Sequence, residues 1–204
     1  MGKNQTAIDD RSDKRGEQPT VLVVDDDEAV VEVYKHSIDD NCDVVTAYDG
    51  EQALETINES VDVVLLDRQM PNLTGGEALE EIRERGYDCR VAMVTGVDPD
   101  FDIVEMPFDA YLTKPVDEEE VRDVVEELLL LSTYDKQFQE YFRLAEKKAA
   151  LETEKTTEEL ATNGEYADVQ DRLDELKREL DALLAAGDDV DFDSAFRSPP
   201  DNDK

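Results

Sequence analysis

The sequence predicts an α/β protein: a five-stranded, doubly wound parallel sheet followed by an α-helical module. From Thr20 onward, short runs rich in Val and Leu alternate with amphipathic stretches, the pattern of βα units in a parallel sheet. Beyond Leu131 the strand-like runs stop, and two helical stretches follow, separated by the turn signal Asn163-Gly164. The chain therefore divides into a sheet domain and a smaller helical domain.

The expected strands are nearly unbroken apolar runs, which is typical of parallel strands buried on both faces. They cover residues 21–24, 43–47, 61–66, 90–94 and 110–112. Helices are expected at 27–39, 50–59, 76–85, 99–106 and 118–131. Pro107 keeps the fourth helix short, and Asp117 with Glu120 has capping-box spacing at the start of the fifth.

The helical module is expected to begin with one helix from Tyr134 to about Ala161. One face of it carries Phe138, Phe142, Ala145 and Ala149. A second helix, ending at 185–187, has apolar residues at alternating steps of three and four, namely Tyr166, Val169, Leu173, Leu176, Leu180 and Leu183. We interpret this short seam as the core of a local helical hairpin, with a dimeric coiled coil as the alternative.

The domain organisation follows from these patterns. Residues 1–19 are polar and without periodicity, so we expect a disordered segment there. The sheet domain covers 20–131 and the helical domain 132–187. Residues 188–204 form an acidic tail, which we also expect to be disordered.

The charge is strongly negative: 55 acidic residues oppose 21 Lys and Arg, giving a formal net charge of −34. Because the acids are spread along the whole chain, we interpret them as an adaptation of the whole protein to a salt-rich, halophilic cytoplasm. An acidic mesophilic protein with a disordered tail is the alternative. No apolar run approaches the roughly 20 residues of a membrane span, and the N-terminus lacks a secretory signal, so a cytoplasmic protein is expected.

Polar residues follow four of the expected strands. Asp25-Asp26-Asp27 comes after the first, Asp67 after the third, Thr95 after the fourth and Lys114-Pro115 after the fifth. In a doubly wound sheet these carboxyl ends meet at one edge, where ligands bind. Converging carboxylates repel each other unless a cation lies among them, and hard oxygen donors suit Mg²⁺. The pattern therefore predicts a magnesium site that handles a phosphoryl group.

Asp67 is the expected nucleophile, because it directly follows an apolar strand and so lies at the mouth of the cleft. Attack by its carboxylate would form an acyl phosphate, with Mg²⁺, Lys114 and Thr95 sharing the phosphoryl oxygens. We expect no chemical role for Asp27 or His36. Asp27 is expected to cap the first helix, and His36 to be an exposed bystander.

Four segments together resemble the receiver domain of two-component response regulators, a flavodoxin-like fold. They are VLVVDDD at 21–27, VVLLDRQMPNLTGGE at 63–77, VAMVTG at 91–96 and AYLTKPV at 110–116, and the resemblance covers about 20–131.

The resemblance implies that a sensor histidine kinase phosphorylates Asp67. It also implies that Asp26, Asp67 and the Gln69 backbone carbonyl bind Mg²⁺ directly and that Asp25 does so through water. Thr95 and Tyr111 would be the switch pair and Lys114 would bind the phosphoryl group. Such a protein is not an enzyme on other molecules, because it catalyses only its own phosphorylation and dephosphorylation.

Residues 141–160 and the helix after them are similar to the HalX domain attached to haloarchaeal receivers. We expect helices 134–187 to contact a second copy or another protein. A DNA-binding transcriptional regulator is the alternative function. Residues 134–204 carry 20 acids and 10 bases and contain no basic recognition helix, which disfavours DNA contact.

A dehalogenase-like phosphatase also uses an aspartate after an apolar strand. That chemistry needs a second acid two positions later, as general acid for the leaving group. The residue in that position is Gln69, whose neutral amide cannot act as a general acid. The sequence therefore excludes this class of enzyme.

Overall fold

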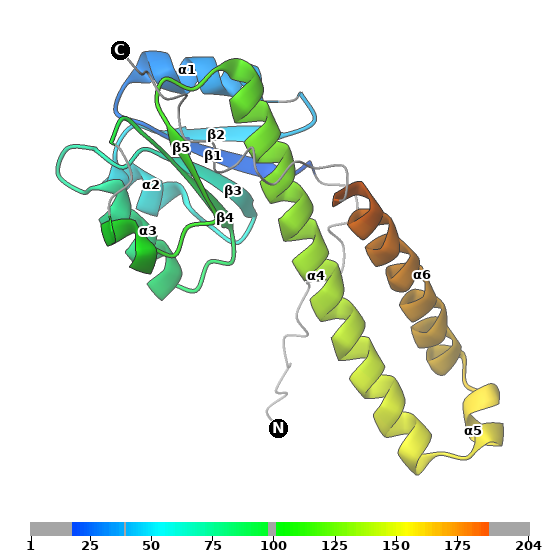
Figure 1. The fold of residues 1–204 in the computed structure, drawn as a ribbon. Helices are drawn as coiled ribbons and strands as arrows, with labels where there is room; N and C mark the ends of the chain where they lie inside the picture. The colour runs from blue at the N-terminus through cyan, green and yellow to red at the C-terminus, as the bar shows by residue number, and fades with distance from the viewer. Residues whose placement is uncertain (1–17, 39, 98–100, 188–204) are drawn as a thin grey trace, which may run out of the picture.

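The described residues, 18–38, 40–97 and 101–187 of this computed structural model, form a five-stranded sheet and a protruding helical hairpin (Figure 1). The strands are β1 (Thr20–Val24), β2 (Asp43–Ala47), β3 (Val61–Leu66), β4 (Arg90–Thr95) and β5 (Ala110–Thr113). Their order is β2-β1-β3-β4-β5, and every pairing is parallel. The strand predictions are confirmed. Residues 1–17 and 188–204, where disordered segments are expected, lie outside the described residues.

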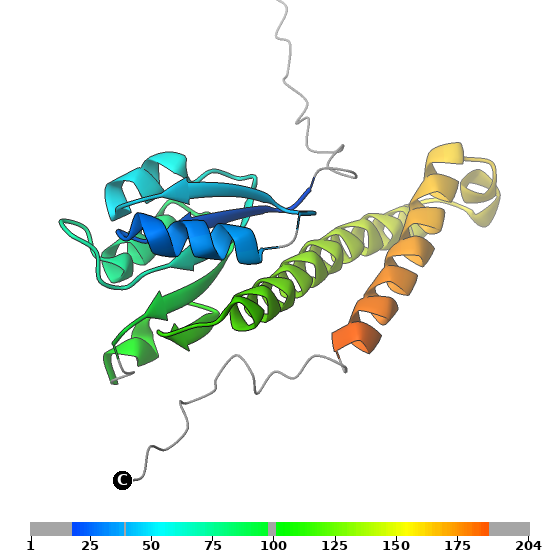
Figure 2. The same ribbon diagram turned by 90° about the horizontal axis from the view of Figure 1, so that it is seen from above.

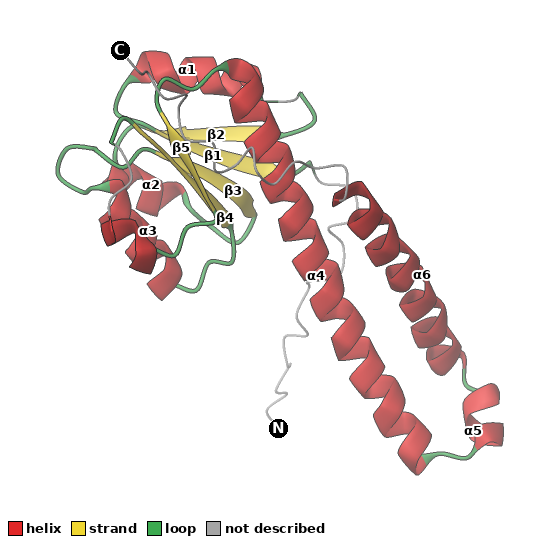
Figure 3. Ribbon diagram, in the orientation of Figure 1, coloured by secondary structure: helices red, strands yellow, loops and turns green. Residues whose placement is uncertain are grey.

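Helices cover both faces of the sheet (Figure 3). One core joins the strands to α1 (Glu28–Ser37) and the start of α4 (Glu118–Glu154), and the other joins them to α2 (Gly50–Thr56) and α3 (Gly75–Glu84). Successive strand residues point to opposite cores: Val21 and Val23 belong to the first, Leu22 and Val24 to the second. Because neither face meets water, the strands read as continuous apolar runs.

The helix expected at 99–106 is the short 3₁₀ helix η1 (Phe101–Glu105), and its first two expected residues lie outside the described ranges. Its shortness agrees with the position of Pro107, whose ring and missing N–H prevent a helix from continuing.

The expected break between a helix at 118–131 and another from Tyr134 is wrong. α4 is a single helix of 37 residues that crosses the boundary between the sheet domain and the helical domain. Glu118 to Glu154 contains no Gly or Pro, and the Thr133 hydroxyl donates to the Leu129 carbonyl inside the helix. With no residue that stops it, the last helix of the sheet domain simply continues outward.

The expected extension of this helix to Ala161 is also wrong. α4 ends at Glu154, and Thr156 caps a separate helix, α5 (Thr157–Ala161). The Thr156 side chain accepts from the Glu159 N–H, while the Glu159 carboxylate accepts from the Thr156 N–H. This reciprocal capping box satisfies N–H groups at a helix start and so favours a new helix over continuation.

The hairpin prediction is confirmed. α6 (Gly164–Gly187) lies antiparallel beside α4, as Figures 1 and 2 show from two directions. Leu173, Leu176 and Leu180 of the seam are buried, and the Tyr166 hydroxyl donates to Glu152 of α4 at 2.7 Å. No helix within the described residues combines the length and the apolar character that crossing a membrane requires.

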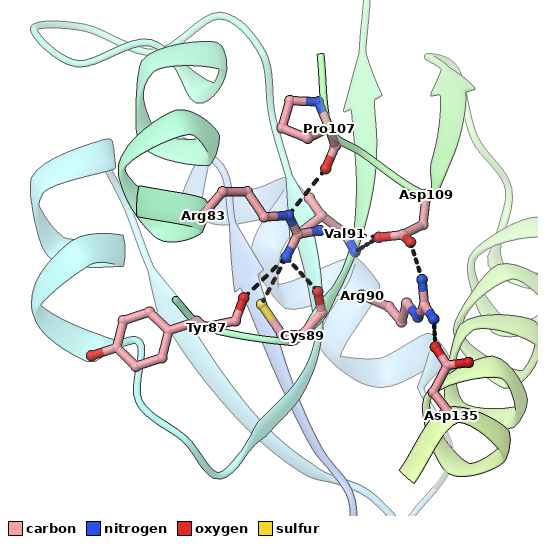
Figure 4. A network of polar contacts seen from close by, with 8 residues as sticks. All are labelled: Arg83, Tyr87, Cys89, Arg90, Val91, Pro107, Asp109 and Asp135. Atoms are coloured by element: carbon pink, nitrogen blue, oxygen red, sulfur yellow. Dashed lines mark hydrogen bonds and ion pairs between the residues drawn. The ribbon is translucent and has the colours of Figure 1, made fainter. Parts of the chain in front are cut away.

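Polar contacts attach the base of the hairpin to the sheet (Figure 4). Asp109 binds Arg83 of α3 at 3.2 Å and Arg90 of β4 at 2.5 Å, and Arg90 also pairs with Asp135 of α4. Lys136, next along α4, pairs with Asp62 of β3. The path of α4 where it leaves the sheet is therefore fixed by ion pairs at the amino ends of the strands, away from the predicted site.

Candidate phosphoacceptor site

The two central aspartates of the prediction lie together. Asp25 follows β1 and Asp67 follows β3, and these strands are paired with Val24 opposite Leu66. Both aspartates are buried, with 2% and 5% of their surfaces exposed. This arrangement follows from the register of the sheet, which places the two carboxyl ends side by side.

Lys114 joins the two carboxylates. Its Nζ lies 2.5 Å from Asp25 Oδ2 and 2.9 Å from Asp67 Oδ1. The backbone fixes the base of this side chain, because the Lys114 N–H donates to the Thr95 carbonyl at 2.8 Å. The Lys114-Pro115 peptide bond is cis.

Burial and charge act in opposite directions on these groups. Burial raises the pKa of Asp67, and the hydrogen bond from Lys114 opposes that rise. Burial by itself would lower the pKa of Lys114, but its hydrogen bonds to Asp25 and Asp67 hold that pKa above its ordinary value. The lysine therefore stays charged, and it partly compensates the buried carboxylates.

The loop after β3 determines how the Asp67 carboxylate points. Its Oδ2 accepts from the Gln69 N–H at 2.9 Å, while Oδ1 faces Lys114. Gly75, the first residue of α3, comes so close that an added Cβ would lie 2.1 Å from the Asp67 carbonyl oxygen. The sequence reasoning did not identify Gly75 as part of the site. The signal was present in the Gly75-Gly76 pair at a helix start.

Thr95 and Tyr111 are linked through the residue between them in space, Val97. Thr95 is fully buried, and its hydroxyl oxygen accepts from the Val97 N–H at 3.3 Å. The Tyr111 hydroxyl donates to the Val97 carbonyl at 2.8 Å, and its ring packs 5.5 Å from that of Phe108. Tyr111 is therefore buried in an inward position beside the loop after β4, where the predicted switch pair can act together.

Asp26 and Asp27 are both exposed, unlike Asp25. Asp27 caps α1, as predicted: its side chain accepts from the Ala29 N–H at 2.9 Å. The Asp27 N–H donates to Asp25 Oδ1 at 3.0 Å, which helps to hold the buried carboxylate. His36 is exposed on α1, as expected.

The predicted metal ligands do not all lie within coordination distance of one point. Within the described ranges, no three His, Cys, Asp or Glu side chains are near enough to hold a metal ion, so Asp26 does not join Asp25 and Asp67. The donors nevertheless fit Mg²⁺ chemically. Two buried carboxylates, Asp25 and Asp67, share a single ammonium, Lys114, and the excess negative charge with hard oxygen atoms is what a divalent cation requires. The ligand set stays a prediction.

A doubly wound sheet with a lysine bridging two buried aspartates at its carboxyl edge defines a receiver-type signalling protein. The chain belongs to the response regulator receiver family, since the family model for the response regulator receiver domain matches residues 21–126. A HalX domain matches residues 130–196. Both resemblances inferred from the sequence are thereby confirmed.

Relatives support this assignment. The chain is 50% identical over 173 residues to a Haloferax volcanii protein whose name proposes a transcriptional regulator; the match covers 84% of this chain and 30% of that protein. It is 36% identical over 114 residues to the alkaline phosphatase synthesis transcriptional regulatory protein PhoP of Bacillus subtilis, covering 53% of this chain and 48% of PhoP. The matches thus span 30% and 48% of the length of these two curated relatives.

Solved structures show the same fold. The receiver domain of DrrB activated by BeF3 matches with a TM-score of 0.51 and 28% identity, covering 55% of this chain and 97% of that one. A CheY-like receiver domain protein from Methanospirillum hungatei JF-1 matches with a TM-score of 0.54 and 26% identity, covering 57% and 98%. The expected α/β fold is therefore confirmed over the sheet domain.

Proposed function

We propose that this chain is a two-component response regulator in which Asp67 accepts a phosphoryl group from a sensor histidine kinase. The observation that carries the proposal is the Lys114 ammonium held between Asp25 and Asp67. An ammonium shared by two buried carboxylates has no evident structural need, because apolar residues would fill the space with less desolvation cost. It is well placed to bind phosphoryl oxygens at the nucleophile.

In the proposed reaction, a carboxylate oxygen of Asp67 attacks phosphorus in line with the bond to the donor histidine nitrogen. The new P–O bond forms as the P–N bond breaks, and the electron pair returns to the imidazole ring. Lys114 and the Thr95 hydroxyl stabilise charge on the phosphoryl oxygens. Asp25, Asp26, Asp67 and the Gln69 carbonyl would hold Mg²⁺, which supplies further charge neutralisation when bound.

The decisive substitution is Asp67→Asn, which keeps the shape of the side chain and removes the nucleophile. We expect loss of labelling by radioactive acetyl phosphate at high salt, with unchanged circular dichroism. Gln69→Asn serves as the control, because its side chain is exposed and only its backbone contacts Asp67. Stoichiometric labelling of Asp67→Asn would refute the proposal.

The metal requirement is tested separately. Asp26→Ala should weaken Mg²⁺ binding, so that labelling needs a higher concentration of the cation, whereas Asp27→Ala should leave that concentration unchanged. A wild-type protein that is labelled at the normal rate after EDTA treatment would show that the carboxylates serve another purpose.

A second candidate function is DNA binding through the helical domain, because the Haloferax volcanii relative is named for transcription and its match is long enough to extend beyond the receiver. The excess of acids over bases in residues 134–204 opposes it. A gel-shift assay with promoter DNA in molar KCl, with and without acetyl phosphate, distinguishes the two.

We also propose that the chain acts in the cytoplasm, where ATP-dependent kinases work.

A further inference from the structure

The outward part of α4 carries an apolar surface that neither the sheet nor the hairpin covers. We define the aromatic stripe as five residues of α4 that share one helix face: Tyr134, Phe138, Phe142, Ala145 and Ala149. The Phe138 and Phe142 side chains are 42% and 51% exposed, although their rings pack against each other with centroids 4.7 Å apart. Exposed aromatic clusters of this kind mark interaction sites.

The hairpin uses a different face of α4. Glu140 binds Arg172 of α6 with both carboxylate oxygens, at 2.9 Å each, and Glu152 binds the Tyr166 hydroxyl. Leu144, between them along α4, is half-buried, whereas Phe142 is exposed. The α6 helix therefore lies beside the aromatic stripe. Phe138, Phe142 and Ala149 stay exposed, while Tyr134 and Ala145 are half-buried.

We propose that the aromatic stripe binds the same stripe of a second copy of this chain, with the two α4 helices antiparallel. The proposal concerns the unmodified protein and does not depend on phosphorylation of Asp67. A two-fold axis between Phe142 and Ala145 would generate this pairing, so that each copy presents the same surface to the other.

The order of side-chain sizes along the stripe favours the antiparallel direction. Large rings occupy its first part and alanines its second. In the antiparallel register, Phe142 meets the partner's Ala145, and Phe138 meets the partner's Ala149. Large and small side chains then interdigitate. In a parallel pair, rings would meet rings and alanines would meet alanines, which would leave a gap at the alanine layers.

The charges are also compatible with self-association. The stripe itself contains no charged residue, whereas the chain as a whole has a net charge of −34. At the stripe's edges, the antiparallel register brings Glu146 toward the partner's Gln139 and Tyr141 toward the partner's Lys148. Neither contact opposes like charges, so this is a surface where two strongly acidic copies can meet.

The size of the stripe predicts a weak dimer. From Tyr134 to Ala149, α4 rises about 22 Å and is about 10 Å wide, so the stripe offers a few hundred Å² at most. A stable interface buries about 800 Å² on each partner. We therefore expect a concentration-dependent dimer that forms in the micromolar range or above, and only where salt screens the remaining charge.

The test is sedimentation equilibrium of the full chain in molar KCl, from micromolar to millimolar protein. Wild type should pass from the monomer mass to the dimer mass, and Phe138→Ser/Phe142→Ser should raise the dimer dissociation constant at least about tenfold. Leu184→Ser is the matched control, because Leu184 is an equally exposed apolar residue, at 55%, on α6. It should dimerise like wild type, and circular dichroism should show all three proteins folded.

A second variant tests the direction. Ala145→Phe puts a ring against the partner's Phe142 in the antiparallel pair and should weaken the dimer. Phe142→Ala/Ala145→Phe exchanges the two sizes and should restore it. Stronger dimerisation of Ala145→Phe alone would overturn the antiparallel arrangement. A wild type that stays monomeric throughout, or a dimer unaffected by Phe138→Ser/Phe142→Ser, would overturn the proposal itself.

Discussion

The receiver site and the hairpin use charged residues differently. At the site, Asp25, Asp67 and Lys114 are held by strand register and by contacts of 2.5 and 2.9 Å, and the two aspartates are almost completely buried. In the hairpin, one leucine seam is buried and the charges lie at the surface, with Arg172 bridging to Glu140 beside it. The site should therefore respond to single-atom changes, and the hairpin to packing and salt.

Truncating the hairpin core should give the largest change in stability. Leu176 is fully buried, so Leu176→Ala should destabilise the hairpin by about 2–5 kcal/mol. Labelling of Asp67 should persist, because the site lies at the opposite edge of the sheet. Leu184→Ala provides the exposed control. Parallel loss of labelling and hairpin structure would show that the two regions unfold as one unit.

A side chain added at Gly75, which packs against the Asp67 backbone, should disturb the phosphoacceptor site more than the hairpin. A Cβ placed 2.1 Å from the Asp67 carbonyl oxygen forces the loop after β3 to move. Gly75→Ala should therefore cost about 1–3 kcal/mol of stability and slow labelling by acetyl phosphate. Gly76→Ala is the matched control, since its Cβ would meet only the flexible end of Met106. Similar behaviour of both variants would contradict the steric argument.

Lowering the salt concentration should produce a smaller difference in stability between the hairpin and the receiver. Each surface ion pair is worth at most about 1 kcal/mol, but screening falls as the Debye length grows from about 3 Å at 1 M to about 8 Å at 0.15 M. We expect the hairpin to melt at a lower temperature than the receiver in dilute KCl. Hydrogen exchange of α6 and β3 amides at both salt concentrations measures this. Equal protection at both concentrations would argue against an adaptation to high salt.

The smallest effect is expected at the switch pair. Tyr111→Phe removes the hydrogen bond to the Val97 carbonyl and should cost about 0.5–1.5 kcal/mol. If Tyr111 and Thr95 act together, the variant should also change the lifetime of phosphorylated Asp67. Tyr87→Phe controls for loss of a hydroxyl elsewhere, because Tyr87 is half-buried beside Arg83, away from the site. An unchanged lifetime would restrict Tyr111 to a structural role.

Most of the sheet and the central site could be predicted from the sequence, because local patterns determine them. The run Val61–Leu66 is apolar except for Asp62 and ends directly before Asp67, so both the strand and the position of Asp67 at its carboxyl end could be predicted. The helical part was harder. The capping-box spacing that predicts a helix start at Asp117 also occurs at Thr156, where no helix start was predicted. The absence of Gly and Pro between Glu118 and Glu154 favours one continuous helix, but a break was predicted near Ser132.

Two further features depend on contacts between distant segments. The approach of Gly75 to Asp67 depends on how α3 packs against the loop, which a spacing pattern does not give. The face of Phe138 and Phe142 was recognised as apolar, but its partner could not be identified. The structure shows that α6 packs against a neighbouring face instead.

The continuity of α4 has a mechanical consequence. The part beyond Asp135 is about 28 Å long and contains no residue at which a helix usually bends. A tilt of about 5° at the base would therefore displace the far end by about 2.5 Å, as with a rigid rod turned at one end. The base is where Asp135 meets Arg90, which also pairs with Asp109, so a small strand shift there would be geometrically amplified at the tip.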